Sequence, residues 1–159
     1  MLCTVSEQRI EVSRWIEAEP ATVFDVLRDP HGHVSIDSSG MLMSATGEPV
    51  EAVGDRFTVH MDREALGDRP LGRYDVDVVI TTYEPDREIA WTVEGVVRPI
   101  IGHVYGYRLE PVEDGTRVTS YYDWSDIHPE WAARDVFPVI NPNSLKATLG
   151  ILARTVQKD

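Results

Sequence analysis

Residues 141–158 have the sequence NPNSLKATLGILARTVQK, and they contain the longest amphipathic helix that the chain predicts. Asparagine at position 141 is a favourable N-cap, and the proline that follows it is tolerated in a first helical turn. Four aliphatic residues recur at steps of four, three and four, which is typical of one helix face: Leu145, Leu149, Leu152 and Val156. This apolar face must be buried, so the rest of the chain has to supply a surface for it.

Alternating apolar and polar residues upstream of this helix predict that surface to be an antiparallel sheet. One strand precedes two short helical segments, near residues 19–29 and 33–40, of which the second is either a helix or a loop. The fold class is therefore α+β, in one domain covering residues 1–159. The strands are expected at residues 8–17, 41–46, 54–62, 74–83, 89–93, 103–110 and 116–125.

The charge of the chain argues against several classes of partner. It has 27 acidic and 15 Lys or Arg residues among 159, a formal net charge of −12, which repels nucleic acid and anionic membrane surfaces. No apolar run approaches the ~20 residues of a membrane-spanning helix, so we expect no stable membrane insertion. Cys3 is the single cysteine, and the first residues lack the basic and apolar regions of a signal peptide. These features predict a cytoplasmic protein.

Three stretches give the chain a resemblance to a known superfamily. They are IEAEPATVFDVLRDP at residues 16–30, LEPVEDGTRVT at 109–119, and YDWS at 122–125 before the last helix. In these stretches the chain resembles the START-like helix-grip (SRPBCC) superfamily, and within it the bacterial polyketide cyclase/dehydrase and lipid-transport family. The resemblance implies a curved sheet of six to seven strands wrapped around the C-terminal helix.

The same resemblance implies a cavity between the sheet and that helix, which holds a lipid, a polyketide or another apolar molecule. Inward strand phases and the apolar helix face predict which residues line it. Aromatic side chains from three neighbouring strands dominate this set. The predicted lining residues are Met41, Met43, Phe57, Val59, Val78, Trp91, Tyr105, Tyr107, Tyr122, Trp124, Leu145 and Leu149.

The residues that could perform chemistry are few. The sequence has no phosphate-binding glycine loop, no nucleophile elbow and no zinc motif, so no cofactor is expected. His31 and His33 lie near carboxylates and could bind a metal, but a place at the mouth of the cavity suits them better, and no metal is expected. His103 begins a strand on the inward phase and is a candidate acid or base, although water-exposed strand ends are the commoner setting for histidine.

Three hypotheses about function follow. The favoured one is a binding protein that holds a hydrophobic or aromatic small molecule without a cofactor. The second is a polyketide cyclase, aromatase or dehydratase in which His33, His103 or a pocket tyrosine transfers protons. The third is a homodimeric interaction module built on an exposed sheet edge or on Trp131.

Overall fold

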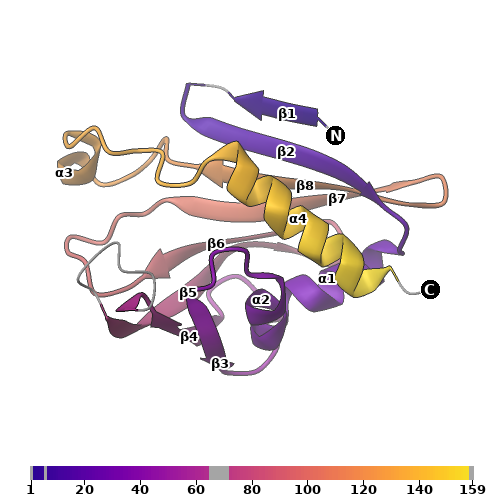
Figure 1. Cartoon of the computed structure of the whole chain (residues 1–159), viewed down its shortest axis with the longest axis horizontal. Coiled ribbons are helices and arrows are strands. Elements are labelled where there is room, and N and C mark those ends of the chain that lie inside the picture. Colours follow the sequence, from indigo (N-terminus) through magenta and orange to yellow (C-terminus); the bar gives the residue numbers. More distant parts are fainter. Residues whose placement is uncertain (1, 6, 65–71, 158–159) are drawn as a thin grey trace.

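The computed structural model describes residues 2–5, 7–64 and 72–157, which form one antiparallel sheet with helices on one face (Figure 1). The strands are β1 (Leu2–Val5), β2 (Arg9–Ile16), β3 (Leu42–Thr46), β4 (Arg56–Asp62), β5 (Arg73–Glu84), β6 (Glu88–Glu94), β7 (Val104–Val112) and β8 (Gly115–Asp123). The helices are α1 (Pro20–Leu27), α2 (Pro30–Ile36), α3 (Pro129–Ala132) and α4 (Pro142–Val156). The α+β class and the order of elements are confirmed.

The sheet has eight strands in the order β1-β2-β8-β7-β6-β5-β4-β3, every pair of which is antiparallel. The sequence predicted six to seven. The additional strand is β1, which pairs with β2 so that Cys3 lies opposite Val12. The β2–β8 register is continuous through Arg14 and Val118, so this arginine is on the inward phase of a regular strand.

The two short helices after β2 each begin at a proline. Pro20 and Pro30 each occupy the first turn of a helix, where the missing N–H costs nothing. The Asp29 side chain caps α2 by accepting a hydrogen bond from the His31 N–H at 2.9 Å. Gly32 allows α2 to approach α1 closely, because a Cβ at this position would overlap the backbone carbonyl of Val26. The segment for which the sequence allowed a helix or a loop is thus a helix, and it begins three residues earlier than expected.

Helix α4 covers part of one sheet face, which we call the inner face. Its N-cap Asn141 accepts a hydrogen bond from the Ser144 N–H at 3.0 Å, and the predicted apolar face is buried. Lys158, at the end of the predicted helix, lies outside the described residues. The main contacts of α4 are with β2, β8, α1 and α2, and it runs diagonally across the sheet (Figure 1). Coverage by α4 is therefore concentrated on the β2–β8 side.

The opposite, outer face of the sheet carries a polar network over its centre. Arg108 forms two hydrogen bonds of 3.0 Å with Glu11, so its side chain points outward. The guanidinium of Arg9 lies 4.1 Å from the ring centroid of Tyr121, and the hydroxyl of Tyr121 donates to Glu88 at 2.5 Å. The polar groups of this network are hydrogen-bonded to one another. We therefore looked to the inner face for a ligand site.

Candidate functional site

Aromatic rings on three adjacent strands line up across the inner face. Trp91 on β6 lies opposite Tyr105 on β7, and Tyr105 lies opposite Tyr122 on β8. The centroids of Trp91 and Tyr105 are 6.2 Å apart in a stacked arrangement, and those of Tyr105 and Tyr122 are 5.0 Å apart. We call these three residues the aromatic row. Their cross-strand placement follows from the inward phases that the sequence predicted.

Burial decreases along the aromatic row from β8 towards β6. Tyr122 has none of its surface exposed, whereas Tyr105 and Trp91 are only partly buried. The reason is the position of α4, which packs on the β2–β8 side and leaves the β6 end of the row less covered. Partly exposed rings in the middle of a sheet are the part of the inner face that a ligand can still contact.

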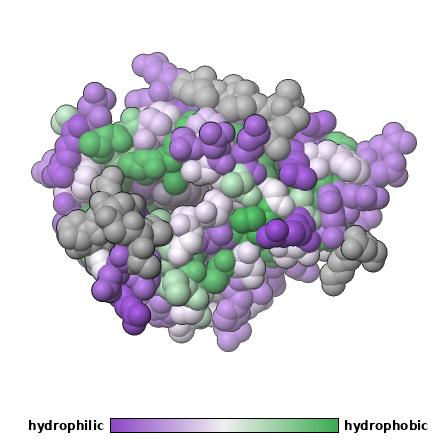
Figure 2. All heavy atoms as spheres, in the orientation of Figure 1, coloured by the Kyte–Doolittle hydropathy of each residue, from purple (hydrophilic) through white to green (hydrophobic). Residues whose placement is uncertain are grey.

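An apolar hollow of about 130 Å³ adjoins this end of the row. Tyr74 and Val76 of β5 and Val93 of β6 form its floor, and Val93 lies two residues from Trp91 on the same strand face. The β6–β7 connection closes it with an unusually apolar loop, and the residues involved are Gly95, Val96, Val97, Ile100 and Ile101. The sequence contained this signal, because VVRPII at residues 96–101 is too apolar for an ordinary exposed loop. Seen from the α4 side, the molecule has a recess bordered by hydrophobic residues (Figure 2).

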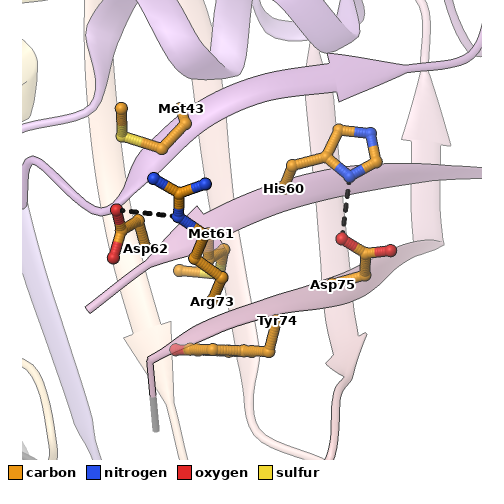
Figure 3. A pocket seen from close by; sticks show the side chains of 7 residues that line it. All are labelled: Met43, His60, Met61, Asp62, Arg73, Tyr74 and Asp75. Carbon is orange, nitrogen blue, oxygen red and sulfur yellow. Dashed lines mark hydrogen bonds and ion pairs between the residues drawn. The ribbon is translucent and has the colours of Figure 1, made fainter. Parts of the chain in front are cut away.

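A second, more open hollow of about 500 Å³ lies where β3, β4 and β5 meet (Figure 3). Its polar rim is internally paired, since the Nδ1 atom of His60 is 2.8 Å from Asp75 and Arg73 lies 3.5 Å from Asp62. The side chain of His60 therefore points outward. Tyr74 borders both hollows.

The predicted lining residues divide into two groups. Most pack against one another in the core beneath α1, α2 and α4, and whether these also contact a ligand stays a prediction: Phe57, Val59, Val78, Tyr107, Tyr122, Trp124, Leu145 and Leu149. The others retain exposed surface. Trp91 and Tyr105 border the open end of the row, whereas Met41 and Met43 lie at the β3 edge, where Met43 is 61% exposed. The sequence did not identify the β6–β7 loop, which forms the wall of the apolar hollow.

His33 lies inside the protein, packed between α2 and the sheet. Its Nε2 atom is 2.8 Å from the carbonyl of Leu27, which as an acceptor requires the proton on Nε2. The ring meets Phe57 and Trp91 edge to face, with centroids 4.9 and 4.6 Å away. Burial lowers the pKa of His33 to about 4, although the Leu27 carbonyl and Asp29 oppose the shift. The described part of the chain contains no cluster of three or more His, Cys, Asp or Glu side chains suited to a metal ion.

His103 is also buried, with 4% of its surface exposed, so the expectation of a water-exposed strand end is wrong. Gly102, in the left-handed region at φ +86°, precedes it at the entry to β7. The Nδ1 atom lies 2.7 Å from the hydroxyl of Tyr122, and rings of Tyr105, Tyr122 and Phe137 surround the imidazole. This apolar setting lowers the pKa of His103 to about 4 through desolvation.

Comparison with known families agrees with this geometry. The model of the family described as polyketide cyclase/dehydrase and lipid transport matches residues 7–157. The chain belongs to this family. Members of this family are expected to have a helix-grip fold with an apolar interior. The sheet, α4 and the aromatic row fit that description. No curated protein matches the sequence.

Solved structures show the same fold at low sequence identity. Protein CV1439 from Chromobacterium violaceum is 16% identical, with a TM-score of 0.67 over 97% of this chain and 100% of that one. Protein Ms6760 from Mycobacterium smegmatis is 12% identical, with a TM-score of 0.69 over 98% and 96%. The Aha1 dimer from Colwellia psychrerythraea is 19% identical, with a TM-score of 0.58 over 93% and 95%. No helix in the described residues is long and apolar enough to cross a membrane.

Proposed function

We propose that this member of the family binds a hydrophobic or aromatic small molecule on the inner face, at the β6 end of the aromatic row. The observation that carries the proposal is the apolar hollow, whose lining residue Val93 lies two residues from the partly exposed Trp91 on the same face of β6. Its walls are almost entirely apolar, and aromatic and apolar walls with few polar groups are typical of small-molecule sites. The family match to cyclases and lipid transporters supports the same ligand class.

The size of the hollow bears on how much of a ligand it encloses. A cavity of ~150 Å³ is enough for one benzene ring. The apolar hollow, at about 130 Å³, is slightly smaller than this, so it accommodates most of one ring or a short alkyl segment. The remainder of a larger ligand would lie along the exposed surfaces of Trp91 and Tyr105, which stack readily on a planar molecule. A molecule that combines a small ring system with a modest apolar extension fits this arrangement best.

A cyclase or dehydratase activity is the second hypothesis, and the two histidines give it little support. A general base works best when its pKa is near the working pH. Burial lowers the pKa of both His33 and His103 to about 4, so each is a weak base at neutral pH. In addition, the Nε2 proton of His33 is held by the Leu27 carbonyl. Binding without chemistry therefore agrees better with the side chains of the inner face.

The third hypothesis, a homodimer, draws support from the likeness to the dimeric Aha1 protein, which shares only the fold. Trp131, which the sequence offered as a contact, donates its indole N–H to the Pro99 carbonyl at 2.6 Å and is partly buried. The indole of Trp131 therefore already has a hydrogen-bond partner within the chain. Light scattering over a range of concentrations decides the matter, and a constant monomer mass would reject the homodimer.

A pair of matched valine substitutions tests the binding proposal. Val96 is 56% exposed at the apolar hollow, and Val53 is 62% exposed in the connection before β4. Because both valines are exposed, Val96→Asp and Val53→Asp should fold alike, but only Val96→Asp places a carboxylate at the hollow. Calorimetry with indane as the probe should show at least a tenfold loss of affinity for Val96→Asp and little change for Val53→Asp. Equal affinities in both variants, or no indane binding to the unmodified protein, would contradict the proposed site.

A further inference from the structure

One buried polar atom on the inner face has no partner. Among the buried side-chain nitrogen and oxygen atoms of the described residues, the Nε2 atom of His103 alone lacks a hydrogen bond. Buried polar atoms in folded proteins are almost always paired, and a lone exception needs an explanation. The surroundings supply none, because the rings of Tyr105, Tyr122 and Phe137 pack around the imidazole.

The surroundings of Tyr122 indicate which nitrogen of His103 carries the proton. The backbone N–H of Val139 opposes the rise in the pKa of Tyr122 that burial causes, as a donor directed at the phenolic oxygen does. The O–H of Tyr122 is then free to donate to the Nδ1 atom of His103, 2.7 Å away. A neutral imidazole that accepts at Nδ1 carries its proton on Nε2. The unpartnered atom is therefore a donor, and it points away from Tyr122 because the two nitrogens lie on different sides of the ring.

His103 neighbours residues of the apolar hollow. Ile101, which lines the hollow, precedes His103 by two residues, and the hydroxyl of Thr92, next to the lining residue Val93, donates to the His103 carbonyl at 2.7 Å. Tyr105, whose ring centroid is 5.1 Å from that of His103, belongs to the aromatic row. The third ring next to the imidazole is that of Phe137, in the connection between α3 and α4, which is only partly buried and has its centroid 6.0 Å away.

We propose that the Nε2–H of His103 is the polar anchor of the site, which donates a hydrogen bond to a neutral carbonyl oxygen of the bound molecule once Phe137 moves aside. The inference rests on the proposed binding function and names its ligand class, a small ring-containing ketone or related carbonyl compound. A neutral donor among apolar rings favours a neutral acceptor, since a buried anion would need a compensating charge. A plain hydrocarbon would leave the donor unpaired, which costs affinity relative to a ligand with an acceptor.

The test compares two probes that differ mainly in one carbonyl group, 1-indanone and indane. In His103→Asn the shorter amide can still accept from Tyr122, but no atom occupies the position of Nε2. The ratio of the two dissociation constants isolates the hydrogen bond, because general apolar contacts are common to both probes. We expect the ratio to shift by about tenfold in favour of indane when asparagine replaces His103.

The outcomes separate this inference from the binding proposal. If both probes bind and the ratio is the same in the unmodified protein and in His103→Asn, the anchor is refuted while the binding site stands. If neither probe binds the unmodified protein, both proposals fail. Should His103→Asn not fold, nitrogen-15 spectra of the histidines in the unmodified protein decide, because 1-indanone should shift the Nε2 resonance of His103 and indane should not. An equal response to both probes would overturn the anchor.

Discussion

Two histidines on the inner face, His33 and His103, are held neutral by burial, and this has a consequence for stability. Their pKa values in the folded protein are about 4, below the value of ~6.5 for an unfolded chain. Between these two pH values the unfolded state binds protons that the folded state does not. The free energy of unfolding is therefore highest above pH ~6.5, where both histidines are neutral in either state. It falls progressively as the pH falls towards 4, by on the order of 2 kcal/mol for each histidine.

His33→Gln tests this contribution, because glutamine can donate to the Leu27 carbonyl in place of Nε2 but does not titrate. Between pH 7.5 and 4.5 the unmodified protein should lose roughly 1–2 kcal/mol more unfolding free energy than His33→Gln, measured by urea denaturation. His31→Gln, on the exposed side of the same helix, is the control. Parallel pH profiles for the unmodified protein and His33→Gln would show that the burial of His33 has no such effect.

At the scale of single elements, replacing a glycine by alanine should have opposite effects on stability at two positions, Gly150 in α4 and Gly106 in β7. Gly150 is in the interior of α4, and a Cβ there would meet the Nη1 atom of Arg14 at 3.6 Å, an ordinary contact. Gly106 lies in β7 beneath the ring of Tyr121, where a Cβ would overlap that ring. Gly150→Ala should therefore stabilise the protein by about 0.5–1 kcal/mol through helix propensity. Gly106→Ala should destabilise it by about 1–3 kcal/mol, because Tyr121 must leave Glu88.

Urea denaturation of the two alanine variants at pH 7.5 measures both effects under one condition. Since the same substitution is made in each, the difference between them reports the surroundings of the two glycines. Stabilisation by Gly106→Ala would mean that the ring of Tyr121 does not lie against β7. Destabilisation by Gly150→Ala would mean that α4 and β2 are packed more closely at Arg14 than the structure shows.

For the whole molecule, the sequence was sufficient for the architecture because periodicity is a local property of the chain. Leucine spacing predicted α4, and alternation predicted β4 to β8, together with the inward phase of Trp91 and Tyr105. The short strand β1 was missed because four residues carry too little pattern. Local patterns also do not say how far α4 extends over the sheet.

The position of the open space depends on that long-range packing. Since α4 packs on the β2–β8 side, its buried residue Leu149 and the strand residue Tyr122 belong to the close-packed core, and the apolar hollow lies towards β5 and β6. The burial of His103 could not be predicted either, because it depends on Tyr122 and Phe137, which are 19 and 34 residues away. The apolar loop at residues 96–101 was visible in the sequence, and it indicates the site once the fold is known.

The most direct test of the account is a titration of the isotope-labelled protein with indane, followed by backbone amide chemical shifts. If the apolar hollow is the binding site, saturable shifts should concentrate in β5 and β6 near Val76 and Val93 and in the loop from Gly95 to Ile101. Residues along α4, such as Leu152, should change little. Saturable shifts centred on α4 or on the β3 edge, or no saturable shifts at all, would contradict the central claim that the ligand binds at the β6 end of the aromatic row.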